Sequence, residues 1–585
     1  MSAQQSYLSQ SNYGCDMVIA VTQQSVNRAM KKMLSGNVGQ EITICYAWNA
    51  DGTRVIPADY NQLVATAGVG DLFTIPTAVY HKGSDVAKAD GAGFAFAFRA
   101  QLGLPATDAS NLPDIVVLDK GSGMATYQLY CREFSVLNLE EAGGGNVLNW
   151  ANLSQTADRP WVFKISVNIG FKSVEFATLQ PDTQAKIKDL NPSTAFTVQQ
   201  LYLDLNTAGL EEVPEITGLD PAGIAYQTIH DTLVKVFINA YFGSMSSDGV
   251  VLGYAVKSSA SDTGSIIPTD LNILVSPSLT AGGDANPQEQ GLYTLNYFVA
   301  TNNHALKDPV PFTWNWLDNT ATDAVFDGVI AVNRNTLRDY FKTQLDGIVA
   351  RNCYIPAVRV TLDSLSRPNY SFSMTAGGTP DVNLTISGKT VLVYSWNPNS
   401  SHDEAGAGGG IGQGTLQPSF TCSMDFTGNT IVITQHLKVY AWVKHLATAQ
   451  GGNVIDKTIT DTYALCIDPY SGTVRIKGSQ AYTDNSQSPD TNGFLDFFTG
   501  VNSLVDSVKA GLSSLVTAGF TDIPLGMMQG CCFPASDTFE LKDVFFSDYQ
   551  DLVSHIVYAD PSVNPATQRA RALKDSGADS IGVAG

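Results

Sequence analysis

Two segments of the chain, 311 positions apart, share one pattern of a short apolar run followed by a helical spacing of apolar residues. The first is DMVIAVTQQSVNRAMKKML, residues 16–34, and the second is DGVIAVNRNTLRDYFKTQL, residues 327–345. Aligned without gaps, they are identical at seven of 19 positions, where chance predicts roughly one or two. The pattern predicts an internal duplication, so the fold must accommodate the same strand-to-helix unit twice.

In each copy the VIAV run ends at a residue that can cap a helix. Thr22 follows it in the first copy and Asn333 in the second, and both side chains can accept the first free helical N–H groups. Apolar residues then recur at helical spacing. They are Val26, Ala29, Met30, Met33 and Leu34 in one copy, and Leu337, Tyr340, Phe341, Leu345 and Ile348 in the other. Each copy therefore predicts a strand, a cap and an amphipathic helix.

Two further segments have helical spacing, residues 220–245 and 493–519, and the second carries Phe494, Phe497 and Phe498. Most of the remaining chain consists of short runs rich in Val, Ile, Thr and Tyr between Gly, Asn, Asp and Pro, which favours antiparallel sheet. A few helices within much sheet indicate an α+β fold. We expect two related halves, residues 1–310 and 311–564, and a flexible tail at 565–585, with the boundary in the proline-containing HALKDPVPFTWNW.

Charge excludes one class of partner. The chain has 34 Lys and Arg against 55 Asp and Glu, a net charge of -21, and no basic cluster, which argues against nucleic-acid binding.

No apolar run reaches the roughly 18 residues of a membrane span. The amino terminus lacks a basic-then-apolar signal sequence. We expect a soluble protein without a transmembrane segment, cytoplasmic or released by a non-classical route.

Catalytic and metal-binding motifs are missing at the usual spacings. We find no CxxC, HExxH or GxSxG. His402, Asp403 and Glu404 stand together and could hold a surface metal, but we expect an exposed turn there, followed by a flexible glycine-rich loop at 406–414. A serine triad assembled from distant positions stays open, because triads are defined by geometry. We predict a protein that is not an enzyme and has no cofactor, metal or catalytic residue.

Several segments resemble one protein family. YGCDMVIAVTQQSVNRAM, residues 13–30, is similar to the amino-terminal opening of accessory proteins from clostridial neurotoxin gene clusters, of the OrfX and forty-seven-kilodalton type. Residues 190–210, VVLGYAVKS, GLYTLNYFV and residues 533–558 resemble later parts of these proteins. A strand, cap and long helix also resemble, more distantly, the TULIP-type domains of bactericidal permeability-increasing protein. The resemblance implies a TULIP-like fold, with long amphipathic helices wrapped by strongly curved antiparallel sheets.

The resemblance also implies a function, which we state as an expectation. Relatives of this fold bind lipids or fatty acids in an apolar groove or build larger complexes, so we expect a lipid-binding or other apolar-ligand-binding protein, auxiliary to a toxin-type gene cluster. The alternative is a structural accessory protein that docks a protein partner without lipid. In that case the apolar residues of the two helices pack into an ordinary core that holds no ligand. The residues expected to line the groove are Val26, Met30, Met33, Leu337, Phe341, Ile348, Phe494, Phe497 and Phe498.

Overall fold

A computed structural model describes most of the chain. The described residues are 2–36, 41–105, 112–119, 121, 123–142, 147–156, 159–179, 181–190, 196–212, 250–258, 266–318, 326–384, 388–467, 474–487, 532–534 and 539–558. Two of the four predicted helices, 220–245 and 493–519, lie outside them, as do Phe494, Phe497, Phe498 and the tail at 565–585.

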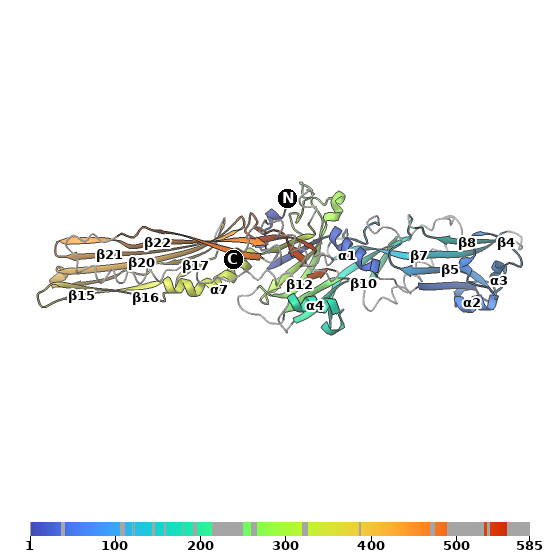
Figure 1. The fold of residues 1–585 in the computed structure, drawn as a ribbon, viewed down its shortest axis with the longest axis horizontal. Coiled ribbons are helices and arrows are strands. Elements are labelled where there is room, and N and C mark those ends of the chain that lie inside the picture. The colour runs from blue at the N-terminus through green and yellow to red at the C-terminus, as the bar shows by residue number, and fades with distance from the viewer. Residues whose placement is uncertain are drawn as a thin grey trace, which may run out of the picture.

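The molecule is an elongated rod with a central sheet and an arm on each side (Figure 1). Every strand pair among the described residues is antiparallel, and the larger sheets are curled. In the second arm, strands pair with the next strand in the chain. Runs of β-branched and aromatic residues separated by turns favour this pairing. The prediction of a strand-rich, antiparallel fold is confirmed.

The central sheet combines strands from both ends of the sequence. Its order is β12-β13-β1-β14-β27-β25, with β26 also paired to β27. The strands are β1 (Met17–Thr22), β12 (Pro268–Ser276), β13 (Thr294–Thr301), β14 (Gly328–Val332), β25 (Phe539–Leu541), β26 (Phe545–Phe546) and β27 (Leu552–Tyr558). Residues before 310 supply one half of this order and residues after 310 the other, and the two halves meet where β1 pairs with β14.

The first arm is an eleven-stranded sheet in the order β24-β11-β10-β9-β7-β5-β2-β3, with β4, β6 and β8 attached at its sides. Its strands are β2 (Glu41–Trp48), β3 (Val55–Ala58), β4 (Ala78–His81), β5 (Phe94–Leu102), β6 (Val116–Val117), β7 (Met124–Ala142), β8 (Val147–Ser154), β9 (Val162–Val174), β10 (Phe196–Glu212), β11 (Val250–Ser258) and β24 (Cys532–Pro534). Helices α2 (Tyr60–Ala67) and α3 (Asp85–Gly91) lie at its far end, and α4 (Pro181–Leu190) lies near the centre of the rod (Figure 1).

The second arm is a seven-stranded sheet in the order β17-β18-β20-β21-β22-β23, with β19 paired to β20. A separate hairpin of β15 and β16 accompanies it. The strands are β15 (Tyr354–Leu362), β16 (Pro368–Ala376), β17 (Asp381–Asn383), β18 (Thr390–Trp396), β19 (Ser401–Ala405), β20 (Gly412–Thr427), β21 (Thr430–His445), β22 (Thr448–Ile467) and β23 (Val474–Asp484).

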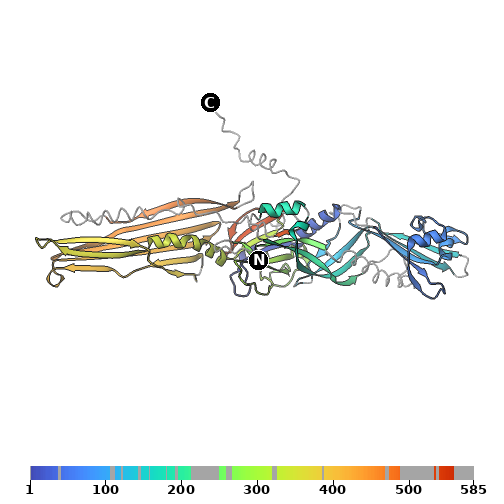
Figure 2. The ribbon, with the colours of Figure 1, turned by 90° about the horizontal axis from the view of Figure 1, so that it is seen from below.

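Both helices predicted from the repeated segments are present. Helix α1 (Gln23–Gly36) follows β1, and α7 (Arg334–Asn352) follows β14. Figure 2 shows α7, in yellow, lying along the sheet of the second arm. The described helices do not support long helices wrapped by sheets, because α7 has 19 residues and α1 has 14. None of the helices in the described ranges has the length and hydropathy to cross a bilayer.

The prediction of an exposed turn at residues 401–406 is wrong. Residues 401–405 form β19, which pairs with the start of β20. The glycine-rich segment that follows is not loop throughout, because Gly412 and Gly414 lie within β20. A Cβ on Gly412 would lie 2.5 Å from Cβ of Pro368, and one on Gly414 would lie 3.0 Å from Val358. These glycines let the β15–β16 hairpin pack directly onto the sheet.

Candidate apolar ligand site

The two repeated strands lie side by side at the centre of the molecule. In the antiparallel pairing of β1 with β14, Ile19 lies opposite Ile330, and these two residues occupy equivalent positions of the repeat. Met17 pairs with Val332, and Val21 pairs with Gly328. Met17 and Gly328 are equivalent positions of the repeat, as are Val21 and Val332. A local twofold axis through the pair of Ile19 and Ile330 therefore relates β1 to β14.

Each helix begins as its capping residue predicts. The hydroxyl of Thr22 accepts a hydrogen bond from the backbone N–H of Ser25 at 3.2 Å. The side chain of Asn333 accepts one from the N–H of Asn335 at 2.9 Å. Each bond satisfies one of the N–H groups that the first helical turn leaves free. The caps at both strand-to-helix passages are confirmed.

Two aspartates join the repeats reciprocally. Asp16 precedes β1, and its carboxylate accepts a hydrogen bond from the hydroxyl of Thr336 on α7 at 2.9 Å. Asp327 precedes β14, and its carboxylate accepts one from the hydroxyl of Ser25 on α1 at 2.5 Å. Ser25 and Thr336 are equivalent positions of the two segments, as are the two aspartates. Each repeat therefore holds the first turn of the other repeat's helix.

The same reciprocity holds for the backbone. The N–H of Asn333 donates to the carbonyl of Asp16 at 2.9 Å, and the N–H of Thr22 donates to the carbonyl of Asp327 at 3.0 Å. The basic residues beside the two aspartates differ. Arg28 contacts the Asp327 carboxylate at 2.7 Å, and His304 contacts the Asp16 carboxylate at 2.9 Å.

The apolar residues at helical spacing on α1 and α7 face the inside of the molecule. Val26, Met30, Leu337 and Phe341 are all at most 5% exposed and belong to one apolar cluster. Phe341 meets Phe426 of β20 edge-to-face, with ring centroids 6.4 Å apart. Ile348 is half-buried against the same cluster. Of the other candidates, Met33 lies on α1 with its side chain outside the described set, and the three phenylalanines of 493–519 lie outside the described residues.

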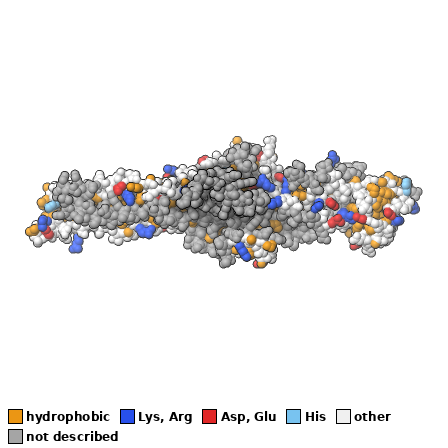
Figure 3. Space-filling view, viewed as in Figure 1, with side chains coloured by type: hydrophobic (Ala, Val, Ile, Leu, Met, Phe, Trp, Pro, Cys, Tyr) orange, Lys and Arg blue, Asp and Glu red, His pale blue; other side chains and the backbone are white. Residues whose placement is uncertain are grey.

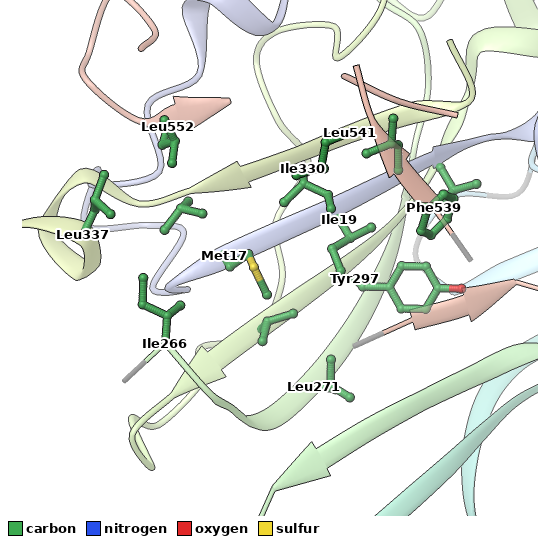
Figure 4. Packing of buried hydrophobic residues seen from close by; sticks show 14 of the residues in the cluster. Met17, Ile19, Ile266, Leu271, Tyr297, Ile330, Leu337, Phe539, Leu541 and Leu552 are labelled. Carbon is green, nitrogen blue, oxygen red and sulfur yellow. The ribbon is translucent and has the colours of Figure 1, made fainter. Parts of the chain in front are cut away.

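This cluster is continuous along the rod. It runs from β7 and β9 of the first arm, across one face of the central sheet, to β20, β21 and β22 of the second arm. Figure 4 shows its central part, where Met17, Ile19 and Ile330 lie among Tyr297, Leu271 and Leu541. A second cluster containing Tyr13, Phe298, Trp314 and Trp316 occupies the opposite face of the sheet.

Among the described residues, the buried donors without a hydrogen-bond acceptor include two in the continuous cluster, the Tyr130 hydroxyl and the Trp161 indole Nε1, both in residues that are 3% exposed. The indole Nε1 atoms of Trp314 and Trp316 in the second cluster are in the same state. Burial raises the pKa of Tyr130 to about 12, with a smaller contribution from the charge of Asp114, so the hydroxyl keeps its proton. Buried donors without an acceptor are rare in proteins. An oxygen atom of an apolar guest would satisfy either donor of the continuous cluster.

A metal site is not formed by the residues that were considered for one. His402, Asp403 and Glu404 succeed one another in β19, where alternate side chains point to opposite faces. His402 contacts the Thr415 hydroxyl at 2.9 Å, and Asp403 accepts the N–H of Val360 at 2.7 Å. Across the described ranges, no group of three His, Cys, Asp or Glu residues is placed to hold an ion.

The structure adds a buried acid that the motif search missed. Asp551 is fully buried and accepts hydrogen bonds from the N–H groups of Leu8 and Arg334 and the hydroxyl of Ser6. Burial raises its pKa to about 7, although these donors and the charge of Arg334 lower it. A sequence signal existed, because Asp551, like Asp16 and Asp327, stands directly before an apolar central strand.

Exposed apolar side chains collect at the far end of the first arm (Figure 3). Trp48 is 48% exposed, Val79 is 58% exposed and Ile56 is 36% exposed, on β2, β4 and β3 respectively. Trp48 and Ile56 lie on paired strands but on opposite faces, because Ile56 pairs with Ala47.

Comparisons with known proteins give matches among solved structures only. No protein-family model matches the chain. No curated protein matches its sequence. Structures of P47 from Clostridium botulinum A2 and of P47 of Clostridium botulinum E1 match with TM-scores of 0.39 and 0.40 and identities of 10% and 9%. Each match covers 93% of this chain, and 97% and 98% of the other.

A lipopolysaccharide binding protein also matches, with a TM-score of 0.24 and 10% identity, over 94% of this chain and 100% of that one. With TM-scores below 0.5, none of these likenesses locates a site or a ligand. The matched structures include the clostridial forty-seven-kilodalton proteins that the sequence also resembles.

Proposed function

We propose that the protein is a non-enzymatic binder of a lipid or another apolar molecule, held in the continuous apolar cluster that the α1 and α7 stripes enter. The observation that carries this proposal is the pair of buried donors, Tyr130 Oη and Trp161 Nε1, in an otherwise apolar interior. An acyl chain would contact the apolar side chains, and its ester or carboxyl oxygen would accept from one of these donors, because Tyr130 and Trp161 lie on opposite faces of the β7–β9 pair. Burial of such a chain is favourable by about 0.8 kcal/mol per CH₂ group.

Two supporting features are TULIP-like. Each helix with an apolar stripe follows a strand of the central sheet, and α7 packs against a curled antiparallel sheet. An auxiliary role in a toxin-type gene cluster fits the resemblance found in the sequence and forms part of the proposal. The expected groove-lining residues, Val26, Met30, Met33, Leu337, Phe341, Ile348, Phe494, Phe497 and Phe498, remain candidates for contact with the guest.

We also infer that the chain consists of two duplicated halves that divide near residue 310. The reciprocal bonds of Asp16 with Thr336 and of Asp327 with Ser25 support this division, because equivalent residues make them in both directions. The strand order supports it as well, since each half gives the central sheet one strand of the VIAV type at the same relative place.

Native mass spectrometry with organic extraction of the purified protein tests the lipid proposal. We expect an extractable guest, or uptake of a fluorescent fatty acid or phospholipid. Tyr130→Phe should weaken uptake and leave the stability of the fold unchanged or slightly raised, because it removes an unsatisfied polar group. Trp161→Phe should also weaken uptake, but it lowers the stability because the smaller ring leaves a cavity beside Phe134. Tyr394→Phe is the matched control, since that hydroxyl already donates to Asp346 at 2.7 Å. No guest, no uptake and no effect of Tyr130→Phe would together contradict the proposal.

A second function has its own observation. Leu337 and Phe341 have no exposed surface, as expected of side chains in a dry core. The apolar surface of Trp48, Ile56 and Val79 would then be the functional part, as the docking site of a structural accessory protein. Replacing Val79 and Ile56 by Ser should in that case reduce partner capture and leave lipid uptake unchanged.

A further inference from the structure

Two aromatic side chains lie on the outer face of the second arm. In β21, the buried residues Val439, Ala441 and Val443 alternate with Tyr440 and Trp442. Successive side chains of a strand point to opposite faces, so this pair faces away from the core. Tyr440 is 37% exposed and Trp442 is half-buried.

Both aromatic side chains lean over a glycine of the next strand. Gly451 of β22 lies directly opposite Trp442. A Cβ on Gly451 would lie 2.8 Å from Cδ1 of Trp442 and 2.8 Å from Oη of Tyr440. No larger residue fits under the pair. Covering a glycine stabilises a sheet, but one aromatic ring is sufficient for that, and two in succession place a broad apolar surface on the solvent side.

Among the described residues, the pair has polar neighbours on its own face. The β20 residues opposite it are Thr415 and Gln417. Neither Tyr440 nor Trp442 belongs to an apolar cluster, and within the described ranges neither ring contacts another aromatic ring. Packing among the residues that the structure describes therefore does not account for their position.

Polar groups surround the pair at fixed positions. Beside Trp442 lie Thr415 and His402, which hydrogen bond to each other at 2.9 Å. In the next row of the same face, Gln413 donates to Glu404 at 3.3 Å, and Lys444 lies opposite Gln413. The groups include donors, acceptors and one charge of each sign, so the surface does not select an ion of one sign.

We propose that Tyr440 and Trp442 form a binding platform for a neutral carbohydrate. A sugar ring has an apolar face of C–H groups, which stacks on an aromatic ring, and a rim of hydroxyl groups that both donate and accept hydrogen bonds. The platform provides the matching features: aromatic side chains spread over a glycine and a rim formed by His402, Thr415, Gln417 and Glu404. The platform lies on rigid paired strands, which lowers the entropic cost of binding. It is independent of the apolar interior and of any guest held there.

Affinity electrophoresis of the full chain tests this proposal. The probes are neutral polysaccharides cast in the gel: a β-1,3-glucan, a xylan, a mannan and starch, with pull-down on insoluble cellulose and chitin. We expect retardation or capture by at least one probe. Trp442→Ala and Tyr440→Ala should each raise the Kd at least about tenfold, as for aromatic side chains at the centre of other interfaces. Trp442→Phe should retain part of the binding.

Tyr482→Ala is the matched control, because Tyr482 is a single aromatic residue, 70% exposed, on the edge strand of the same sheet. Its binding should equal that of the parent. Circular dichroism checks that each variant is folded. The proposal is overturned if no probe binds, or if Trp442→Ala and Trp442→Phe both bind like the parent. It is overturned as well if Trp442→Ala instead changes the sedimentation of the protein alone, which would make this face a protein–protein contact.

Discussion

The two strand-to-helix passages share their hydrogen-bond framework but differ in the groups around it. In both, the capping residue donates its N–H to the other repeat, and an aspartate of the other repeat accepts the hydroxyl of the first helical turn. At the first residue of each helix the acceptor differs. The N–H of Gln23 on α1 donates to the carbonyl of Tyr293, whereas the N–H of Arg334 on α7 donates to the carboxylate of Asp551.

The next helical turn differs in the same way. Asn27 of α1 is 2% exposed and binds the backbone of residues 115 and 116, next to an edge of the first arm's sheet. Arg338, its equivalent on α7, donates to the carbonyl of Leu384 beside β17. The comparison shows that equivalent residues of the two copies keep the same position and the same role in hydrogen bonding. Charge and burial differ at this position, because α1 uses the buried neutral amide of Asn27 and α7 uses the guanidinium of Arg338.

The largest expected effect tests the apolar side of the comparison. Phe341→Ala removes a fully buried ring in contact with Phe426 and should lower the free energy of unfolding by about 3–5 kcal/mol. Met30→Ala, at the equivalent position of α1, should cost about 2–5 kcal/mol. Urea unfolding followed by circular dichroism measures both. A negligible cost at either position would mean that the buried stripe does not stabilise that copy.

The next effect tests the reciprocal bonds. Hydrogen bonds to charged groups contribute about 1.5–3 kcal/mol. Double-mutant cycles pairing Asp16→Ala with Thr336→Ala, and Asp327→Ala with Ser25→Ala, should therefore give coupling energies in this range that agree with each other. A coupling in one pair only would break the symmetry of the comparison. The pair of Asp85 and Lys88, both exposed, serves as a control that should couple by less than about 1 kcal/mol.

The third effect depends on pH and compares the two acceptors at the helix starts. Asp551 at the start of α7 can titrate, whereas the carbonyl of Tyr293 at the start of α1 cannot. Burial raises the pKa of Asp551 from 3.8 to about 7, so between about pH 4 and pH 7 the folded state binds this proton and the unfolded state releases it. Stability from this group is therefore complete below pH 4 and falls as pH rises to 7, by at most about 1.4 kcal/mol per pH unit.

Asp551→Asn should remove this dependence. The measurement is the difference in unfolding free energy between parent and variant across pH 4–7.5, which should shift in favour of the variant as pH rises. A difference that does not change with pH would show that the carboxyl titrates alike in both states, and the proposed contrast between the two helix starts would fail.

The smallest effect compares the two helix-to-sheet contacts. Asn27→Ala leaves the N–H groups of Ile115 and Val116 without their acceptor, which should cost about 1–3 kcal/mol. Arg338→Ala removes a donor to Leu384 but leaves no buried donor unpaired, so we expect about 1 kcal/mol or less. Thermal unfolding of both variants provides the ranking. Equal costs would indicate that the charged contact is as strong as the buried amide contact.

Local pattern was sufficient for the parts of the fold near each helix start. The caps at Thr22 and Asn333, the two helices and the burial of Val26, Met30, Leu337 and Phe341 all follow from residue type and spacing. The strand-rich antiparallel character followed from composition and turns. The segment at 401–406 was mispredicted because its polar residues are typical of a turn, whereas pairing with β20 makes them a strand.

The sequence by itself determined that one strand–cap–helix unit occurs twice, because apolar spacing and capping chemistry are local properties. Only the tertiary structure decided that the two VIAV strands pair with each other and that Asp16 and Asp327 each hold the opposite helix. It also decided which polar residues are buried and that Tyr440 and Trp442 lie over Gly451. The physical reason is that register between strands 311 positions apart depends on the free energy of the whole packed sheet, which no local window of residues contains.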